Sequence, residues 1–225
     1  MPAAHAMDMD ATAMCERYEA LYTGLIADVL DERGHPARAL GTDVMPIDPT
    51  HVVAGLAFPA VGRPHDGVDP EAQMQRFLTM LGEAPAASCL VIAAQADVAA
   101  HVGELTTTAL AAQGCLGVVT DGGVRDTAAV LAQGFPVFSR YRSPLDSIPR
   151  WELEAWDTTV TIDGVSIAPG DVVIGDIDGV VIVPRADAEA VLTRAEEVAT
   201  TEDAVRAAIT DGMSPQAAYD RHGKF

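Results

Sequence analysis

A strand, a glycine-rich turn, a helix and a second strand follow one another within residues 114–144. The apolar run from Leu116 to Val119 predicts a buried strand, which ends at the acidic turn Asp121-Gly122-Gly123. Arg125-Asp126 then opens a helix that stops at Gly134, and an apolar run resumes after it. Two strands joined by a helix usually lie parallel in one sheet. This unit therefore favours a fold that contains a parallel sheet covered by helices.

The rest of the chain adds helices before this unit and hairpins after it. Helices are expected at 24–33, at 69–81, at 103–114 and at 187–209, and Asp69-Pro70-Glu71 is a strong helix start. Strands are expected at 52–60, 88–93, 158–162, 165–168, 172–174 and 180–183, with a hairpin turn at Asp163-Gly164. Residues 35–50 are typical of a loop. The mixture of parallel units and hairpins predicts an α/β fold built as a layered sandwich.

The composition fits one domain with a strongly acidic surface. The chain has 225 residues, 49% of them hydrophobic, and residues 13–225 are expected to form a single domain behind a flexible N-terminus at 1–12. The formal net charge of −19 would repel the phosphates of a nucleic acid and leaves a basic protein partner open. The start of the chain lacks a signal-peptide pattern, and no apolar run approaches the ~20 residues that span a bilayer. We therefore expect no membrane partner and a cytoplasmic location.

The use of lysine and cysteine narrows the possible chemistry. Lys224 is the only lysine, so the interior offers neither the desolvated lysine of a Schiff-base enzyme nor the lysine of a phosphate-binding P-loop. Cys15, Cys89 and Cys115 show no CxxC spacing, which argues against a zinc site and a disulfide framework. Carbonyl chemistry in this chain would need a metal ion or an arginine to polarise its substrate.

Arg125-Asp126 places a cation and an anion side by side at the turn from strand to helix. The carboxylate of Asp126 suits a hard divalent ion, and the guanidinium of Arg125 can grip a substrate carboxylate with two hydrogen bonds. The alternative is a structural ion pair in which the helix dipole favours Asp126. On spacing alone, the structural pair is the more common arrangement.

Several longer segments resemble one protein family. They are YTGLIADVLDERG, VAGLAFPAV, GELTTTALAAQGCLGVVTDGGVRD, GFPVFSR, PGDVVIGDIDGVVIVP and a tail like GMSPQAAYDRHG. Together they run through almost the whole chain, and they resemble the RraA-like family (regulator of ribonuclease activity A), which includes metal-dependent 4-hydroxy-4-methyl-2-oxoglutarate aldolases. The central segment is specific, and DIDGVVIVP supports it independently.

The resemblance implies a β/β/α sandwich related to the swivelling phosphohistidine domain. It implies assembly as a trimer, or as a hexamer of two trimers, with active sites between subunits. It also implies cleavage of a 2-oxo acid aldol to pyruvate with Mg²⁺ or Mn²⁺, and decarboxylation of oxaloacetate. The expected partners are therefore a small 2-oxo acid and further copies of the chain.

The same resemblance implies roles for individual residues. Asp126 matches the aspartate that binds the metal, and Arg125 matches the arginine that holds the substrate's oxygen and steadies the enolate. The backbone N–H groups of Gly103-Glu104-Leu105-Thr106 match the cradle for the substrate carboxylate. Glu104 lies where an acidic residue holds metal-bound water, and Asp121 lies in the same turn as the pair, so a metal-bound water held by either would relay the proton. A solvated first-turn carboxylate and a turn former are the structural alternatives for these two.

One position departs from the aldolase pattern. Ala129 stands where the aldolases carry an acidic residue, three positions after the metal aspartate, so the distal half of the substrate stays open. The family also expects an acidic residue from the C-terminal region of a neighbouring subunit. Glu196, Glu202 and Asp203 are equally suited to that part.

Five further polar residues are candidates for which structural roles are more common. His101 precedes the cradle by two positions, and a lone histidine is more often structural. Asp176 and Asp178 resemble paired carboxylates but fit a hairpin turn. Arg140 and Arg142 follow a strand and would meet a substrate's distal carboxylate if they faced the site, although surface cations are commoner.

Three function classes remain after these arguments. The leading hypothesis is a metal-dependent lyase that acts on a 2-oxo acid aldol. The second is a protein-binding regulator that inhibits an endoribonuclease, and an intact Asp126 argues for the enzyme over this alternative. The third is a carboxylate-binding protein without catalysis. A methyltransferase is not supported, because no glycine-rich nucleotide loop follows an early strand.

Overall fold

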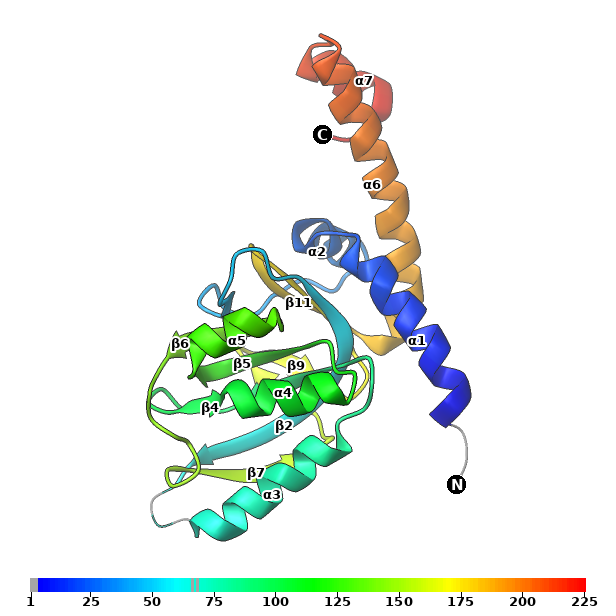
Figure 1. Ribbon diagram of the computed structural model, residues 1–225. Coiled ribbons are helices and arrows are strands. Elements are labelled where there is room, and N and C mark those ends of the chain that lie inside the picture. Colours follow the sequence, from blue (N-terminus) through cyan, green and yellow to red (C-terminus); the bar gives the residue numbers. More distant parts are fainter. Residues whose placement is uncertain (1–3, 66, 68) are drawn as a thin grey trace.

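A large mixed sheet forms the body of the protein (Figure 1). The computed structural model describes residues 4–65, 67 and 69–225. In this part of the chain the sheet has nine strands, with the path β1-β6-β5-β3-β2-β10-β11, β4 beside β5 and β7 beside β2. Their bounds are β1 (Met45–Pro46), β2 (Val53–Pro64), β3 (Ser88–Ala93), β4 (Ala100–Val102), β5 (Gly117–Val124), β6 (Val137–Arg142), β7 (Trp151–Trp156), β10 (Val172–Asp176) and β11 (Gly179–Val183). The predicted α/β class is confirmed.

The middle of the sheet is parallel and contains the predicted strand–helix–strand unit. Strand β2 runs parallel to β3, β3 to β5, and β5 to β6, with Val118 opposite Val137 in the last pair. Helix α5 (Thr127–Gln133) crosses between β5 and β6. It ends at Gly134, whose φ of 67° is the left-handed conformation that glycine adopts at helix ends. The unit at 114–144 therefore folds as its sequence indicates.

The two edges of the sheet approach each other, so the sheet is nearly closed like a barrel. The chain just before β1 pairs with β11 at the opposite edge: the Leu40 N–H donates to the Val180 carbonyl at 2.9 Å, and the Ile182 N–H donates to the Arg38 carbonyl at 3.0 Å. Such closure pairs strand edges that would otherwise be open. The finer expectation, a β/β/α sandwich like the swivelling phosphohistidine domain, stays a prediction.

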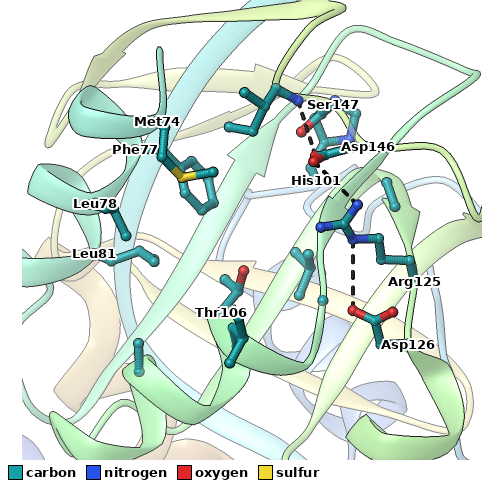
Figure 2. Close-up of a pocket in the computed structure, with 16 residues that line it drawn as sticks. Met74, Phe77, Leu78, Leu81, His101, Thr106, Arg125, Asp126, Asp146 and Ser147 are labelled. Atoms are coloured by element: carbon teal, nitrogen blue, oxygen red, sulfur yellow. Dashed lines mark hydrogen bonds and ion pairs between the residues drawn. The ribbon is translucent and has the colours of Figure 1, made fainter. Parts of the chain in front are cut away.

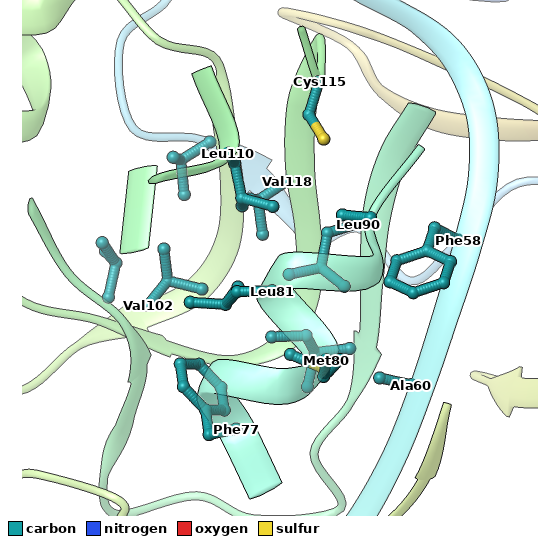
Figure 3. Packing of buried hydrophobic residues seen from close by; sticks show 14 of the residues in the cluster. Phe58, Ala60, Phe77, Met80, Leu81, Leu90, Val102, Leu110, Cys115 and Val118 are labelled. Atoms are coloured by element: carbon teal, nitrogen blue, oxygen red, sulfur yellow. The ribbon is translucent and has the colours of Figure 1, made fainter. Parts of the chain in front are cut away.

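Helices cover the sheet on two sides and a hairpin fills its interior. Helices α3 (Pro70–Glu83) and α4 (Glu104–Ala112) pack with α5 over β3 and β5, and Figure 3 shows this cluster around Phe77, Met80 and Leu110. Helices α1 (Ala4–Glu19), α2 (Thr23–Glu32) and α6 (Ala188–Thr210) cover β10 and β11. The hairpin β8 (Val160–Ile162) and β9 (Val165–Ile167) packs against the inner core. Helix α7 (Pro215–His222) folds back onto α6, which projects from the body (Figure 1).

The structure differs from the sequence predictions at several places. Residues 121–123 belong to β5 and do not form a turn, because Gly123 pairs with Tyr141 of β6 and with Ala100 of β4 after a shift of register. Part of the segment 1–12, expected to be flexible, lies in α1, where alanine and methionine favour a helix. The expected loop at 35–50 contains β1, and β4, β7 and α7 were not predicted.

Two expectations about buried and apolar segments can be compared directly with the fold. Cys89 and Cys115 are buried thiols, as predicted from their apolar surroundings, and Cys15 is buried too. None of the helices in the described part of the chain is long and apolar enough to cross a membrane.

Candidate active site

A cavity of about 190 Å³ lies between helices α3 and α4 and the neighbouring ends of β4 and β5. Figure 2 shows side chains of α3 on one wall, and on the other those of β4, of the turn after β5 and of the loop after β6. The cavity is lined by Met74, Phe77, Leu78, Leu81, Ala100, His101, Val102, Gly103, Leu105, Thr106, Ala109, Arg125, Asp126, Asp146, Ser147 and Ile148. The structure thus brings Arg125 and Asp126 together with three of the four predicted cradle residues.

The backbone of Asp126 turns its carboxylate away from its own helix. Asp126 precedes α5 with φ 53° and ψ 29°, the left-handed region that few residues other than glycine adopt, and its side chain makes no capping hydrogen bond to α5. Instead, Oδ2 accepts the N–H of Glu104 at 3.4 Å and lies 3.7 Å from Nε of Arg125. The carboxylate therefore faces the start of α4. A left-handed backbone at this point is the kind of local strain that occurs at functional sites.

Gly103 is required for this close approach. A Cβ at position 103 would lie 2.7 Å from Oδ2 of Asp126 and 3.2 Å from Cγ of Arg125. The glycine therefore leaves space directly beside the two charged groups. Leu105 and Thr106 follow it in the first turn of α4, whose leading N–H groups have no partner within the helix. Such a helix start attracts carboxylates and other anions.

Asp146 is a site residue that the sequence did not reveal. Its Oδ2 lies 3.3 Å from Nη1 of Arg125, and its Oδ1 accepts the N–H of Ile148 at 3.2 Å (Figure 2). The loop is fixed to β4, because the Ala100 N–H donates to the Leu145 carbonyl at 2.8 Å. A single aspartate within SPLDSIP looks like a turn residue in the sequence, so only the tertiary pairing shows that it holds the arginine.

Glu104 and Asp121 lie outside the cavity. The carboxylate of Glu104 accepts hydrogen bonds from Oγ1 of Thr108 at 3.0 Å and from Nε2 of Gln133 at 3.1 Å, so it joins α4 to α5. Asp121 is buried within β5, where Oδ1 accepts the Ala94 N–H at 2.5 Å. Burial raises the pKa of Asp121, while this hydrogen bond and the charge of Arg140 lower it. Neither carboxylate contacts Arg125 or Asp126 in the described structure.

His101 lines the cavity with no hydrogen-bond partner in the described part of the chain. The residue is only 3% exposed, and both of its ring nitrogens are unpaired there. Its ring meets Trp151 edge to face at a centroid distance of 4.9 Å, and it packs against Gly122, where a Cβ would lie 2.3 Å from Nδ1. Burial lowers the pKa of His101 to about 4, so the ring is neutral at pH 7.

Most of the other candidate residues are engaged away from the cavity. Asp176 accepts hydrogen bonds from the Thr23 N–H at 2.8 Å and the Asp178 N–H at 2.9 Å, which agrees with a structural turn. Arg140 pairs with Asp43 and Asp163. Nη2 of Arg142 donates to the Ile47 carbonyl at 3.1 Å.

The three acidic residues considered for a neighbouring subunit already have partners within the chain. Glu196 pairs with Arg17 at 2.7 Å. Glu202 lies 3.9 Å from Nζ of Lys224, and Asp203 pairs with Arg206. In the residues that the structure describes, no group of three or more histidine, cysteine, aspartate or glutamate side chains could hold a metal ion. Asp126 and Asp146 are therefore the carboxylates that this chain itself brings to the cavity.

Comparison with known proteins identifies similar sequences and folds. The model of the RraA-like family, described as Aldolase/RraA, matches residues 23–182. A protein of Halalkalibacterium halodurans named "Putative 4-hydroxy-4-methyl-2-oxoglutarate aldolase" is 31% identical over 143 residues, which are 63% of this chain and 68% of that protein. A solved structure described among novel cellulases from microbes of the gut ecosystem is 34% identical, with a TM-score of 0.81 over 85% of this chain and 86% of the other.

A further solved structure shares the fold at lower identity. Streptomyces coelicolor RraAS2, described as an unusual member of the RNase ES inhibitor RraA protein family, gives a TM-score of 0.76 at 23% identity. The alignment covers 86% of this chain and 96% of that one. At this identity the likeness establishes the fold and not the activity.

Proposed function

The chain belongs to the RraA-like family, and from this premise we propose that it is a divalent-metal-dependent lyase. Its substrate would be a 4-hydroxy-2-oxo acid, cleaved to pyruvate and a second carbonyl compound, with decarboxylation of oxaloacetate as a side activity. The proposal rests mainly on one observation: Arg125, Asp126 and the first turn of α4 line the same cavity. The aldolase name of the 31% identical relative supports the same reaction class.

The residues beside Asp126 fit a hard divalent ion. Mg²⁺ is commonly held by one or two carboxylates and keeps several waters, so a single aspartate is an adequate anchor. Oδ1 of Asp126 accepts no hydrogen bond within the described residues, whereas Oδ2 accepts the Glu104 N–H and faces Arg125, so Oδ1 is the oxygen free to bind an ion. Asp126 would therefore hold the ion. A divalent ion bound there would act as a Lewis acid and stabilise the negative charge that develops on the substrate.

The chain's own residues account for binding and for charge stabilisation. The first-turn N–H groups at Leu105 and Thr106 would bind the carboxylate of the 2-oxo acid. In the cleavage, the 4-hydroxyl loses its proton, the C3–C4 bond breaks, and its electron pair becomes the enolate of pyruvate, which takes a proton at C3. Arg125, fixed by Asp126 and Asp146, would stabilise the enolate oxygen. Asp146 would accept the hydroxyl proton, because it lines the cavity while the carboxylates of Glu104 and Asp121 are bonded elsewhere.

We further propose that the active site lies between subunits of a trimer or a hexamer. Leu105 and Leu78, which line the cavity, are 78% and 51% exposed in the single chain. Water that enters an open site weakens its electrostatic contacts, and a neighbouring subunit would exclude it. Activity per chain is therefore expected to fall as the oligomer dissociates. Light scattering and pyruvate release across one dilution series would check this, and a fully active monomer would contradict the shared site.

The test of the proposed function is release of pyruvate. A coupled assay should detect pyruvate from a panel of 4-hydroxy-2-oxo acids and from oxaloacetate in the presence of Mg²⁺ or Mn²⁺, and none after chelation. Inhibition of an endoribonuclease without pyruvate release would instead favour the regulator.

A further inference from the structure

One side chain of helix α5 holds the first turn of α4. Gln133, the last residue of α5, donates from Nε2 to Oε1 of Glu104 at 3.1 Å and to Oγ1 of Thr108 at 2.8 Å. Oγ1 of Thr108 donates in turn to the same oxygen of Glu104 at 3.0 Å, which closes a ring of hydrogen bonds. On the other side of the amide, Oε1 of Gln133 accepts from Oγ1 of Thr107 at 2.6 Å. We call Gln133, Glu104, Thr107 and Thr108 the clamp.

The clamp acts on the first residue of α4, which is also held at its backbone. The Glu104 N–H donates to Oδ2 of Asp126, at the opposite end of α5 from Gln133. Because α5 has seven residues and is therefore about 10 Å long, Glu104 contacts both ends of one short helix. These contacts fix the first turn of α4 relative to Asp126, the proposed metal anchor.

The clamp also reaches a peptide group that carries one of the cradle N–H groups. Nε2 of Gln133 lies 3.4 Å from the carbonyl oxygen of Glu104. That carbonyl and the N–H of Leu105 belong to one planar trans peptide, in which the two groups point in opposite directions. A contact that restrains the carbonyl therefore restrains the direction of the Leu105 N–H, which is proposed to bind the substrate carboxylate.

Neither helix is long enough to keep this geometry by itself. Helix α4 has nine residues and α5 has seven, and isolated helices of such length are marginal in water. Their relative position therefore depends on contacts between them, and the clamp supplies such contacts at the first turn of α4. All of its hydrogen bonds join residues of one chain, so none of them depends on a neighbouring subunit. Glu104 and Gln133 do not line the cavity, so they would affect a ligand there only through α4.

We propose that Gln133 is a positioning residue for carboxylate binding. Through Glu104 it holds the first-turn N–H groups of α4 beside Asp126, so that one 2-oxo acid can contact both the helix start and the metal site. This inference rests on the proposed lyase function and adds to it a role for two residues outside the cavity. It gives Glu104 a part in this hydrogen-bond network, in place of the metal-bound water that the family resemblance implies.

The first experiment removes the amide without a change of charge. Methionine has nearly the length of glutamine and forms helices equally well, so Gln133→Met is expected to fold. Calorimetry with Mg²⁺ present should show pyruvate binding weaker by about tenfold or more, because a misplacement of about 1 Å in a site can cost about a hundredfold. The affinity for Mg²⁺ alone should stay close to that of the wild type, since Asp126 is retained.

Gln113→Met is the matched control. Gln113 follows the last residue of α4, where Nε2 donates to the Leu81 carbonyl of α3, and it does not line the cavity. Both variants lose hydrogen bonds of an amide on α4, so both should unfold at a lower temperature than the wild type. Only Gln133→Met should weaken pyruvate binding. An unchanged pyruvate affinity in Gln133→Met, or an equal loss in the control, would overturn the inference.

An exchange of the two side chains tests their pairing. Gln133→Glu alone places a second carboxylate against Glu104, and the repulsion should weaken pyruvate binding. Glu104→Gln combined with Gln133→Glu again pairs an amide with a carboxylate and keeps the net charge, so it should restore most of the pyruvate affinity. A lack of recovery would contradict the positioning role, and it is the result expected if the carboxylate of Glu104 acted at the metal.

These binding measurements separate failure of the inference from failure of the lyase function, because they need no turnover. Weaker pyruvate binding in Gln133→Met, without pyruvate release from any substrate by the wild type, would reject the lyase and retain the positioning role. Pyruvate release by the wild type, with equal pyruvate affinity in Gln133→Met, would retain the lyase and reject the positioning role. Absence of pyruvate binding to the wild type would overturn both proposals.

Discussion

Asp126→Asn is expected to lose pyruvate release and Mg²⁺ binding together. Asparagine is nearly the same size and tolerates the left-handed backbone at position 126, where alanine would add strain. The variant therefore removes the negative charge and keeps the local fold. Loss of a residue that only orients a metal ligand costs about 10–100-fold in affinity or activity, so loss of the anchor itself should exceed about a hundredfold. Calorimetric titration with Mg²⁺ and the pyruvate assay measure the two effects.

The control for this variant is Asp178→Asn. Asp178 is an exposed aspartate at the turn between β10 and β11, outside the cavity. It should keep wild-type metal binding and activity. Equal Mg²⁺ affinity in wild type and Asp126→Asn would remove Asp126 from the metal site, and the carboxylate would return to the role of a structural partner for Arg125.

Arg125→Ala is expected to keep the metal and lose most of the turnover. In the proposed mechanism the guanidinium would stabilise the negative charge of the enolate, and removal of such a donor costs about 2.7–4 kcal/mol, or about a hundredfold to a thousandfold in kcat. Arg125→Lys should recover only part of this, because an ammonium lacks the planar fork that contacts Asp126 and Asp146. The measurements are kcat and KM with saturating Mg²⁺, beside a Mg²⁺ titration.

Arg142→Ala supplies the comparison for the arginine variant. Arg142 lines a second hollow that Arg125 and Asp126 also border, but it donates to the Ile47 carbonyl and does not line the cavity. Its removal should leave kcat within a few-fold of wild type. If Arg125→Ala kept near-wild-type turnover, the pair at 125–126 would be structural and the proposed mechanism would fail.

Local sequence patterns predicted the units that position the site. The apolar run before residue 121, the charged pair and Gly134 specify a strand, a helix start and a helix end, and each of these signals acts within a few residues. β3 was predicted at its observed bounds, Ser88–Ala93, because its run is apolar on both faces. β4 was missed because it has three residues and is defined by its pairing with β5.

Arg125 and Asp126 are neighbours in the chain, and the family resemblance, not a local pattern, joined them to the start of α4. Asp146 and the apolar face of α3 line the same cavity through tertiary packing that no local pattern encodes. Glu104 shows that a local pattern can give the position of a residue without giving the direction of its side chain. Its place in the first turn is visible in the sequence, but the side chain points toward Gln133 of α5, because that helix offers it a hydrogen bond at 3.1 Å.

The most direct test of the account is to locate the metal. Mn²⁺ can replace Mg²⁺ at oxygen sites and is visible by anomalous scattering, so crystals grown with Mn²⁺ and pyruvate would show where both bind. We expect an anomalous peak beside the carboxylate of Asp126, with pyruvate between Arg125 and the first turn of α4. A peak at any other carboxylate, or pyruvate bound away from Arg125, would contradict the proposed site.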